Sequence, residues 1–316
     1  MNLNILVIGS AGQDGSYLVD RLDRAGHDVY GITRSGLVLP NKEQSRDCNI
    51  ESMPEVASVI SEVSPDRVFY LAAYHHSSEE KEAGEGSIIR RSFAVHVLGL
   101  VNVLEAFAAS CPKGRLFYAA SSRVFGSPAT APQDEDTPFN PSCPYGISKT
   151  AGVQTVRLYR RRGLHCCAGF LYNHESERRP DHFVSQKIVK GVIAIERGQT
   201  EELVLGDLTA MVDWGYAPEY VEAMERILDL DEAGDFVIAS GRLHSIQDFT
   251  AAAFEYVGLK WQDHVKVDPS IIRPTAATVP MVGDSSRLRA MTDWQPKTEL
   301  RDLVRIMVDA ERERSA

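Results

Sequence analysis

The sequence has no excess of basic residues, and this limits the partners that the protein can bind. Its 316 residues include 34 Lys and Arg against 44 Asp and Glu, so the formal net charge is −10. Binding to nucleic acid or to an anionic membrane by general electrostatic attraction needs a basic surface. The composition therefore predicts neither partner, and it requires any phosphate group to be held by a local site.

Long unbroken apolar runs are also missing. No stretch approaches the roughly 18 consecutive apolar residues that indicate a membrane-spanning helix. The apolar run Leu3–Ile8 lacks a basic leader and ends in a glycine turn, so it predicts a strand rather than a signal peptide. The five cysteines are odd in number and form no Cys-x-x-Cys pair. This pattern favours reduced thiols and a cytoplasmic protein.

The first half of the sequence alternates strand-like and helix-like segments. The predicted strands are Leu3–Ile8, Asp28–Thr33, Arg67–Leu71, Arg115–Ala120 and His165–Leu171. The predicted helices are Ser16–Ala25, Met53–Val63, Phe93–Ser110 and Tyr145–Arg162. Repeated βα units with nearly continuous apolar strands predict an α/β fold, namely a Rossmann-type doubly wound parallel sheet with helices on both faces.

The rhythm changes after about Tyr172, which predicts a second unit. Helices are expected at Phe183–Arg197, Pro218–Leu228, Ser245–Val257 and Glu299–Glu313, with short strands at Leu203–Leu205 and Phe236–Ala239. We therefore divide the chain into a dinucleotide-binding domain, residues 1–172, and a smaller mixed α/β C-terminal substrate lobe, residues 173–316. Some later segments are expected to return to the main sheet. The acidic stretch Ser78–Ser87 predicts a loop.

A glycine-rich run between the first strand and the first helix predicts a phosphate-binding turn. Its sequence is Gly9-Ser-Ala-Gly12-Gln-Asp-Gly15. The glycines permit a tight turn and let backbone N–H groups approach a pyrophosphate at the positive end of the helix. The alternative is a glycine turn without a ligand. The candidate cofactor contacts in this run are Gly9, Ala11, Gly12, Gln13, Asp14 and Gly15.

The end of the second strand predicts which dinucleotide is bound. NAD-binding proteins usually carry an acid there, about 20 residues after the glycines, to hold the ribose hydroxyls. This sequence has Gly31-Ile-Thr-Arg34-Ser35, with an arginine and no acid. We therefore predict NADP(H), with NAD(H) as the alternative. Further candidate cofactor contacts are Arg34, Asn49, Ile50, Leu71, Ala72 and Ala73.

Three residues form a candidate redox centre. Ser121 follows the fourth strand, and Tyr145 and Lys149 are four residues apart on the next helix, hence on one face. A lysine charge lowers the pKa of a nearby phenol, which can then take a proton from a substrate hydroxyl as hydride leaves for the nicotinamide. Ser121 would hydrogen-bond the same hydroxyl. The alternative is a surface tyrosine and lysine on an amphipathic helix.

These residues resemble the extended short-chain dehydrogenase/reductase family, and most closely its GDP-mannose 4,6-dehydratase branch. The resemblance covers nearly the whole chain. The runs that carry it are Gly12–Leu18, Leu71–Ala73, Thr137–Phe139, Ser142–Gly146, Asn173–Ser176 with Arg178 and Arg179, Asp213–Gly215, Tyr220–Met224, Arg273–Thr275 and Trp294–Lys297. The resemblance implies a nucleotide-sugar substrate and an NADP that is retained through a cycle begun by oxidation at C4 of the sugar.

Three positions depart from the family pattern. Family dehydratases carry a glutamate two residues after the serine or threonine, which removes the C5 proton; here that position is Arg123, which stays protonated and cannot act as this base. Two polar positions that hold the nucleotide in the family are Val212 and Ala276. The segment after the second strand is also shorter than in the family, where it helps to form a tetramer. We therefore expect a homodimer through Phe93–Ser110 and Tyr145–Arg162, with a tetramer as the alternative.

Several polar residues are candidate substrate contacts. By family position, and because arginine suits phosphate geometry, we assign the pyrophosphate to Arg178, Arg179 and Lys187, with a solvated loop and helix as the alternative. The full set of substrate candidates is His75, Ser122, Asn173, Glu175, Arg178, Arg179, Lys187 and Arg273. His75 and His76 have no further ligands at metal spacing, so no metal site is predicted.

The sequence therefore predicts an NAD(P)-dependent enzyme acting at C4 of a nucleotide sugar. Without the C5 base, oxidation and re-reduction remain, which favours a 4-epimerase or a 4-keto reductase/dehydrogenase. One alternative is 4,6-dehydration with another residue as base. A second is a non-catalytic NADP(H)-binding sensor.

Overall fold

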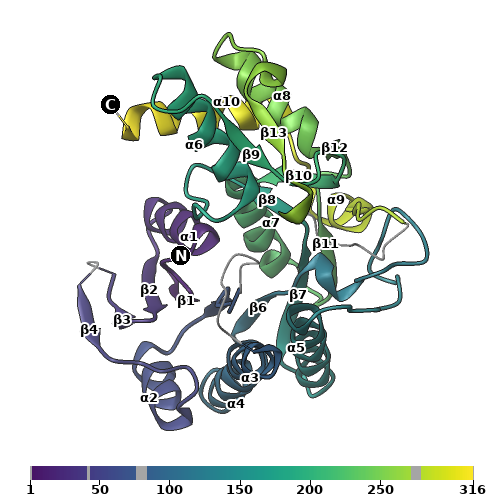
Figure 1. The fold of residues 1–316 in the computed structure, drawn as a ribbon. Coiled ribbons are helices and arrows are strands. Elements are labelled where there is room, and N and C mark those ends of the chain that lie inside the picture. The colour runs from purple at the N-terminus through teal and green to yellow at the C-terminus, as the bar shows by residue number, and fades with distance from the viewer. Residues whose placement is uncertain (1, 41–42, 76–83, 272–278, 316) are drawn as a thin grey trace.

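The computed structural model describes residues 2–40, 43–75, 84–271 and 279–315, and an eight-stranded sheet lies at its centre (Figure 1). The strand order is β11-β7-β6-β5-β1-β2-β3-β4, with parallel pairing from β11 to β2 and antiparallel pairing at β3 and β4. The strands are β1 (Asn4–Ile8), β2 (Asp28–Thr33), β3 (Gly36–Val38), β4 (Gln44–Arg46), β5 (Arg67–Tyr70), β6 (Arg115–Ala119), β7 (His165–Leu171) and β11 (Asp235–Ile238). The predicted doubly wound parallel sheet is confirmed. The β3–β4 hairpin at its edge was not predicted.

Helices cover both faces of this sheet. One face carries α2 (Met53–Val63), α3 (Glu85–Phe93), the π-helical turn η1 (Ala94–Leu98), α4 (Gly99–Ser110) and α5 (Pro144–Arg161). The other carries α1 (Gln13–Arg24), α7 (Ala217–Asp229) and α9 (Ser286–Thr292). Strand side chains alternate between the two layers. In β1, Leu6 and Ile8 pack toward the α2 layer, and Ile5 and Val7 toward the α1 layer.

Local sequence signals explain where several helices begin. Proline lacks a backbone N–H and is therefore favoured in the first turn. It occupies this position in α2, α5 and α7, as Pro54, Pro144 and Pro218. α8 (Ile246–Tyr256) begins with a capping box, in which Ser245 and Asp248 each accept a hydrogen bond from the other's backbone N–H.

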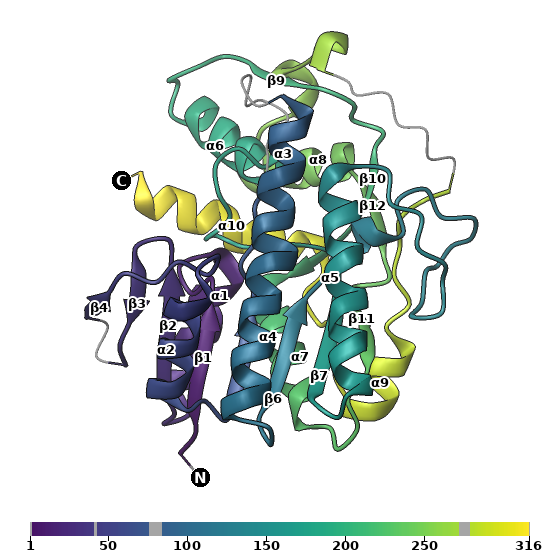
Figure 2. The same cartoon turned by 90° about the horizontal axis from the view of Figure 1, so that it is seen from below.

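The helix from Glu85 to Ser110 is longer than predicted. Its N-terminal part, Glu85–Ser87, belongs to the stretch expected to form a loop, whereas residues 78–83 of that stretch lie outside the described residues. By length and composition this helix could span a membrane, although polar residues interrupt its apolar run. In the protein 44% of its apolar window is buried, and the helix packs against α2 and α5 (Figure 2). It is a core helix of the sheet layer.

A smaller unit follows residue 172. Its three helices are α6 (Val184–Glu196), α8 and α10 (Leu300–Arg314), which enclose a separate apolar core. Its short strands are β8 (Asn173–Glu175), β9 (Leu203–Leu205), β10 (Met211–Tyr216), β12 (Leu243–Ser245) and β13 (Val265–Val267). Single 3₁₀ turns occur both before and after residue 172, namely η2 (Ser122–Val124), η3 (Trp261–Asp263) and η4 (Pro269–Ile271). The later elements α7, β11 and α9 return to the main sheet. The division of the chain at residue 172 stays a prediction.

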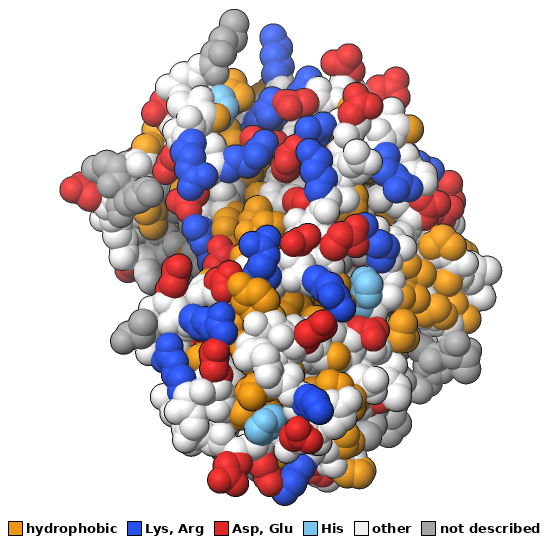
Figure 3. All heavy atoms as spheres, turned by 90° about the horizontal axis from the view of Figure 1, so that it is seen from above, with side chains coloured by type: hydrophobic (Ala, Val, Ile, Leu, Met, Phe, Trp, Pro, Cys, Tyr) orange, Lys and Arg blue, Asp and Glu red, His pale blue; other side chains and the backbone are white. Residues whose placement is uncertain are grey.

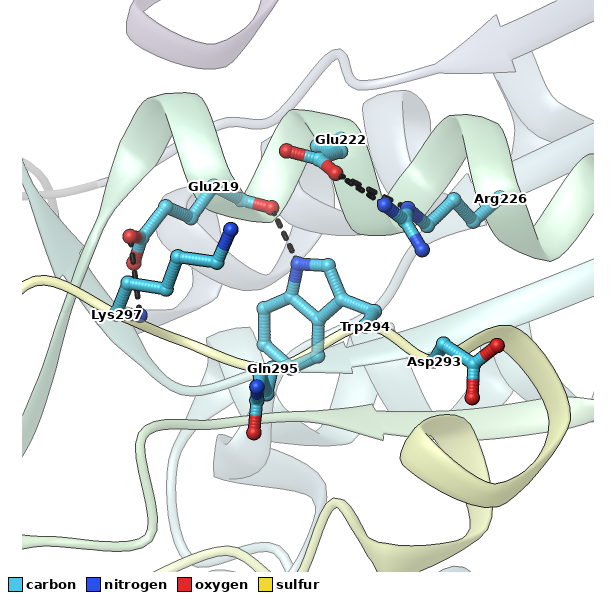
Figure 4. A pocket seen from close by; sticks show the side chains of 7 residues that line it. All are labelled: Glu219, Glu222, Arg226, Asp293, Trp294, Gln295 and Lys297. Carbon is cyan, nitrogen blue, oxygen red and sulfur yellow. Dashed lines mark hydrogen bonds and ion pairs between the residues drawn. The ribbon is translucent and has the colours of Figure 1, made fainter.

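Two of the runs that carry the family resemblance have structural roles. Asp213 is buried and accepts hydrogen bonds from Ser240, Gly241 and Gly283, which join β10 to two distant segments. Trp294 is also buried, and its indole N–H donates to the Glu219 carbonyl of α7 (Figure 4). Most side chains that line the small pocket drawn there are charged: Glu222 pairs with Arg226 within α7, and Glu219 accepts hydrogen bonds from the backbone N–H groups of Lys297 and Thr298. We assign no ligand to it.

Candidate active site

The glycine turn after β1 has the backbone geometry of a phosphate-binding loop. Gly9 has φ +93°, and a Cβ there would lie 2.8 Å from the Ala72 amide nitrogen. A Cβ on Gly15 would lie 2.2 Å from the Gly9 carbonyl oxygen. Only glycine tolerates this conformation and this approach. α1 begins at Gln13, directly after Gly12 and earlier than predicted, so its N-terminus opens at the turn. This arrangement fits a dinucleotide pyrophosphate.

The side chains of Gln13 and Asp14 bind the Asn173–Ser176 segment. His174 Nε2 is 2.9 Å from an Asp14 carboxylate oxygen. Gln13 donates to the His174 carbonyl and accepts from the Ser176 hydroxyl. Burial opposes the charge on both members of the pair, but their mutual attraction lowers the pKa of Asp14 and raises the pKa of His174. The side chains of Gln13 and Asp14 thus link the phosphate turn to β8. The backbone N–H groups of the turn remain available to bind a phosphate.

The three candidate redox residues lie together at the carboxyl end of β6. The Ser121 hydroxyl accepts a hydrogen bond from the Arg123 backbone N–H at 3.2 Å and lies close enough to the Tyr145 phenol to favour its ionised form. Lys149 is buried beside them, with its Nζ 5.7 Å from the centroid of the Tyr145 ring. The same Nζ donates to the Ala119 carbonyl at 2.7 Å. The helical spacing of four therefore places phenol and ammonium on one face of α5, as predicted.

Burial controls the ionisation of this group. It raises the pKa of Tyr145 to about 12 and lowers the pKa of Lys149 to about 7. Desolvation therefore dominates the pKa of Tyr145 in the unliganded site, and the lowering of this pKa by Lys149 stays a prediction. The cation that opposes the shift of Tyr145 most strongly is Arg179. With these pKa values, the Tyr145 phenol of the unliganded site is uncharged at neutral pH. The Lys149 amine gains or loses its proton near neutral pH.

Two histidine rings flank the phenol. The His75 ring centroid lies 5.8 Å from that of Tyr145, and His96 lies 5.1 Å from it on another side. His75 also contacts His182 and Phe183, at 6.1 and 5.0 Å. The structure thus places the substrate candidate His75 beside the redox residues. Sequence analysis missed His96, whose only signal was an isolated histidine in an apolar helix.

The candidate substrate arginines are held by ion pairs on different elements. Arg178 binds Asp20 of α1 at 2.8 Å and covers the Tyr17 ring. Arg179 pairs with the buried Glu175 at 3.1 Å and stacks on Phe183 at 3.5 Å. Arg179 is also close enough to Tyr145 to oppose the rise of its pKa, whereas Arg178 lies against α1.

The other substrate candidates are spread over the same region. Glu175 also accepts from the Ser185 hydroxyl at 2.6 Å. Ser122 is buried in η2, Asn173 is exposed on β8, and Lys187 lies on α6. Arg273, together with His76 and Ala276, lies outside the described residues.

Most cofactor candidates lie at the carboxyl ends of parallel strands. Arg34 is exposed in the turn after β2, and Leu71–Ala73 follow β5 beside Gly9. Asn49 follows β4 and accepts from the Glu51 backbone N–H, while the Ile50 carbonyl accepts from Asn102. In doubly wound sheets, ligands bind at this edge, where the strand order reverses. Here the reversal lies between β1 and β5.

Arg123 has an exposed side chain on the η2 turn that follows Ser121. Among the described residues its guanidinium has no hydrogen bond or ion pair. Over the same part of the chain, no three His, Cys, Asp or Glu side chains are grouped to hold a metal ion. Arg123 thus remains available to a ligand, and it offers charge and N–H donors but no proton-accepting group.

The sequence pattern of one protein family, described as GDP-mannose 4,6 dehydratase, matches residues 6–307. The chain belongs to this family. GDP-mannose 4,6 dehydratase 1 of Arabidopsis thaliana is 35% identical over 98% of this chain and 89% of its own length. The human GDP-mannose 4,6 dehydratase is 32% identical over 97% and 90%. The chain is accordingly an NAD(P)-dependent enzyme of the extended short-chain dehydrogenase/reductase type, as the sequence predicted.

Solved structures of more distant proteins share the fold. RMD from Pseudomonas aeruginosa complexed with NADPH has a TM-score of 0.82 at 20% identity, covering 98% of this chain and 99% of that one. The UDP-glucose 4-epimerase of Thermotoga maritima with UDP-glucose has a TM-score of 0.84 at 22% identity, covering 100% of both chains. A member of the GDP-mannose 4,6-dehydratase family thus has the same architecture as 4-epimerases.

Proposed function

We propose that this enzyme oxidises and re-reduces C4 of a nucleotide-activated sugar, as a 4-epimerase or a 4-keto reductase/dehydrogenase. The observation that carries the proposal is the pairing of the Ser121–Tyr145–Lys149 group with Arg123 at the position of the dehydratase glutamate. The group supplies proton transfer at a sugar hydroxyl. Arg123 supplies no base for the C5 proton that dehydration must remove.

The proposed proton transfer uses the contacts of the Tyr145 phenol. Ser121 orients the sugar hydroxyl and Tyr145 exchanges a proton with it, while Lys149 favours the phenolate when it is charged. NAD(P)⁺, when bound, accepts the hydride and brings a positive charge that lowers the phenol pKa. The glycine turn would hold its pyrophosphate. Arg179, which opposes the rise of the Tyr145 pKa, is the arginine best placed to bind the substrate's phosphates.

The test is to incubate the purified enzyme and added NADP⁺ with GDP-mannose and with UDP-glucose in D₂O and to analyse the products by mass spectrometry and NMR. The added NADP⁺ is the oxidant that net formation of a 4-keto sugar requires. A new stereoisomer or a 4-keto sugar without loss of water, and without deuterium at C5, is expected. Loss of one water with deuterium at C5 would show dehydration instead. The matched variant is Arg123→Glu, which restores a carboxylate and should introduce C5 exchange.

Dehydration is the second candidate, and two observations favour it. The identity to GDP-mannose 4,6 dehydratases spans nearly the whole chain. His75 lies beside Tyr145 and could replace the glutamate as the C5 base. If the wild-type enzyme dehydrates, His75→Phe should remove C5 exchange, while oxidation at C4 in a single turnover should persist.

We further propose NADP(H) as the cofactor, because Arg34 follows β2 and no acid replaces it. Titration of the cofactor-free protein with both dinucleotides tests this, and NAD(H) binding about tenfold tighter would overturn it. Denaturing the purified protein and identifying the released dinucleotide separates a retained cofactor from an exchanging reductase. The family relation also supports a nucleotide sugar as the small-molecule partner and a cytoplasmic location. The homodimer is proposed on other grounds, because the segment after β2 is shorter than the family segment that helps to form a tetramer.

A further inference from the structure

His96 is a buried histidine that the proposed chemistry does not use. It is fully buried in η1, and its ring lies edge-on to the Tyr145 ring at an interplanar angle of 84°. Its Nε2 is 2.9 Å from the Tyr74 backbone nitrogen, which donates to it. Its Nδ1 is 2.8 Å from the Ser148 hydroxyl, which donates to the Tyr145 carbonyl at 2.9 Å.

These hydrogen bonds define one protonation state of the imidazole. A backbone N–H can only donate, so Nε2 must carry the lone pair and Nδ1 the proton. The Nδ1–H then donates to the Ser148 oxygen, because the single hydrogen of that hydroxyl is used on the Tyr145 carbonyl. Burial, together with the charges of Lys149 and His75, holds the pKa of His96 well below its usual range. The ring is therefore neutral with a fixed tautomer.

The backbone around His96 is built to present it to the site. η1 is a π-helical turn, an irregularity that leaves carbonyl groups without their usual partners. Two tyrosines of the sheet satisfy these groups: Tyr70 donates to the Val95 carbonyl and Tyr118 to the His96 carbonyl. One extra residue in a helical turn rotates the preceding side chains by about 100° relative to those that follow. The π turn thereby directs His96 toward α5.

We propose that His96 is a positioning residue for Tyr145. Its two ring nitrogens join the Tyr74–His75 segment, which follows β5, to the first turn of α5, and its ring limits the rotation of the phenol. These two segments are far apart in sequence and are separately tethered to the sheet, so the imidazole fixes their spacing and with it the distance from Tyr145 to Ser121. This inference rests on the proposed redox role of Tyr145.

Three substitutions separate the contacts of the imidazole. His96→Phe keeps a ring of similar size but removes both nitrogens. His96→Asn can retain a donor near the Nδ1 position, and His96→Gln an acceptor near the Nε2 position. His165→Phe is the matched control, because His165 begins β7 at the opposite edge of the sheet. The wild type and the four variants are assayed with GDP-mannose or UDP-glucose, whichever the wild type converts.

We expect His96→Phe to lower kcat at least about tenfold, with KM changed less than threefold and a shifted pH profile of kcat. The Asn and Gln variants should each recover part of the rate, and His165→Phe should match the wild type. Wild-type kcat and pH profile in a folded His96→Phe protein would overturn the proposal. If that variant fails to fold, wild-type kinetics in both His96→Asn and His96→Gln would overturn it equally.

A second measurement does not depend on turnover. The ¹⁵N NMR spectrum of histidine-labelled protein, with His96 assigned by its absence from His96→Gln, should show a neutral Nδ1–H ring from pH 6 to 8. An Nε2–H tautomer or a protonated ring would contradict the proposed contacts. If no sugar is converted but the Nδ1–H tautomer is found, the proposed function fails and the contact stands. If the wild type is active and the variants match it, only the positioning role fails.

Discussion

At the scale of single residues, the candidate site is defined by polar groups withdrawn from water. Lys149 is 1% exposed and has a backbone carbonyl as its hydrogen-bond acceptor. Among the residues that the structure describes, no acid forms an ion pair with it, and burial lowers its pKa to about 7. The same burial keeps the Tyr145 phenol protonated. Burial of these groups therefore comes at the expense of folding stability.

Removing the phenolic oxygen should abolish the chemistry and spare the fold. Tyr145→Phe keeps the ring contacts with His75 and His96, so cofactor binding and melting temperature should stay close to the wild type. The kcat should fall by at least about 100-fold, since the proton-transfer group is lost. Steady-state kinetics and dinucleotide titration on one preparation test this. Turnover near the wild-type rate would mean that another group moves the proton.

Replacing the buried ammonium should stabilise the protein near neutral pH. Between pH 7 and 10.5 the unfolded chain binds a proton at Lys149 that the folded chain does not, so the free energy of unfolding rises with pH across this window. Lys149→Met should therefore stabilise at pH 7 by roughly 2–4 kcal/mol, below the roughly 5 kcal/mol of the full shift because the Ala119 carbonyl loses a donor. The gain should vanish toward pH 10.5.

Urea denaturation at pH 7, 8.5 and 10 measures this difference. The matched control is Lys113→Met at an exposed lysine, for which no pH-dependent gain is expected. A Lys149→Met stability difference that is constant over this range would show that the folded-state pKa of Lys149 lies close to that of a solvated lysine.

At the scale of elements, the phosphate turn is held by contacts with two other segments and by a close contact within itself. It packs on the end of β5 through Gly9, closes on itself at Gly15 and binds β8 through Gln13 and Asp14. These contacts join the first βα unit to the start of the smaller unit. The turn is therefore a rigid junction, which suits a site that must hold a charged pyrophosphate without rearrangement.

A methyl group at Gly15 should damage this junction. The added Cβ would meet the Gly9 carbonyl at 2.2 Å, and backbone atoms cannot yield as a flexible side chain would. Gly15→Ala should weaken dinucleotide binding about tenfold or more and destabilise the fold by about 1–3 kcal/mol. Calorimetric titration and thermal melts provide the readouts. Gly84→Ala is the control, since a Cβ there meets nothing within 4 Å, and equal effects of both substitutions would refute the steric argument.

At the scale of the whole molecule, exposed apolar side chains occur on two helices that pack side by side. Leu98 is 59% and Ile147 44% exposed, and Ile89 and Leu158 are each 38% exposed on the same helices. By contrast, basic and acidic side chains are interspersed over the face on the side of the smaller unit (Figure 3). Exposed apolar groups of this kind favour association with a second copy of the chain.

Placing a charge on this helix pair should disrupt the proposed homodimer. Leu98→Asp is expected to convert a dimer into a monomer, because burying an unpaired carboxylate in an apolar interface is strongly unfavourable. Light scattering coupled to size exclusion gives the mass directly. Met211→Asp, at another exposed apolar residue on β10 (47% exposed, against 59% for Leu98), should remain dimeric. A monomeric wild type, or a Leu98→Asp protein that still dimerises, would refute this surface as the interface.

The sequence by itself determined the βα alternation, the glycine turn and the spacing of Tyr145 and Lys149, because these depend on periodicity and on neighbours along the chain. Only the tertiary structure decided that Gln13 and Asp14 bind the His174 segment and that Arg178 lies against α1. It also decided that burial raises the Tyr145 pKa. It also placed His96 beside the Tyr145 phenol through a π-helical turn that no sequence pattern predicted. Such features depend on desolvation and on contacts between distant segments, which exist only once the chain has folded.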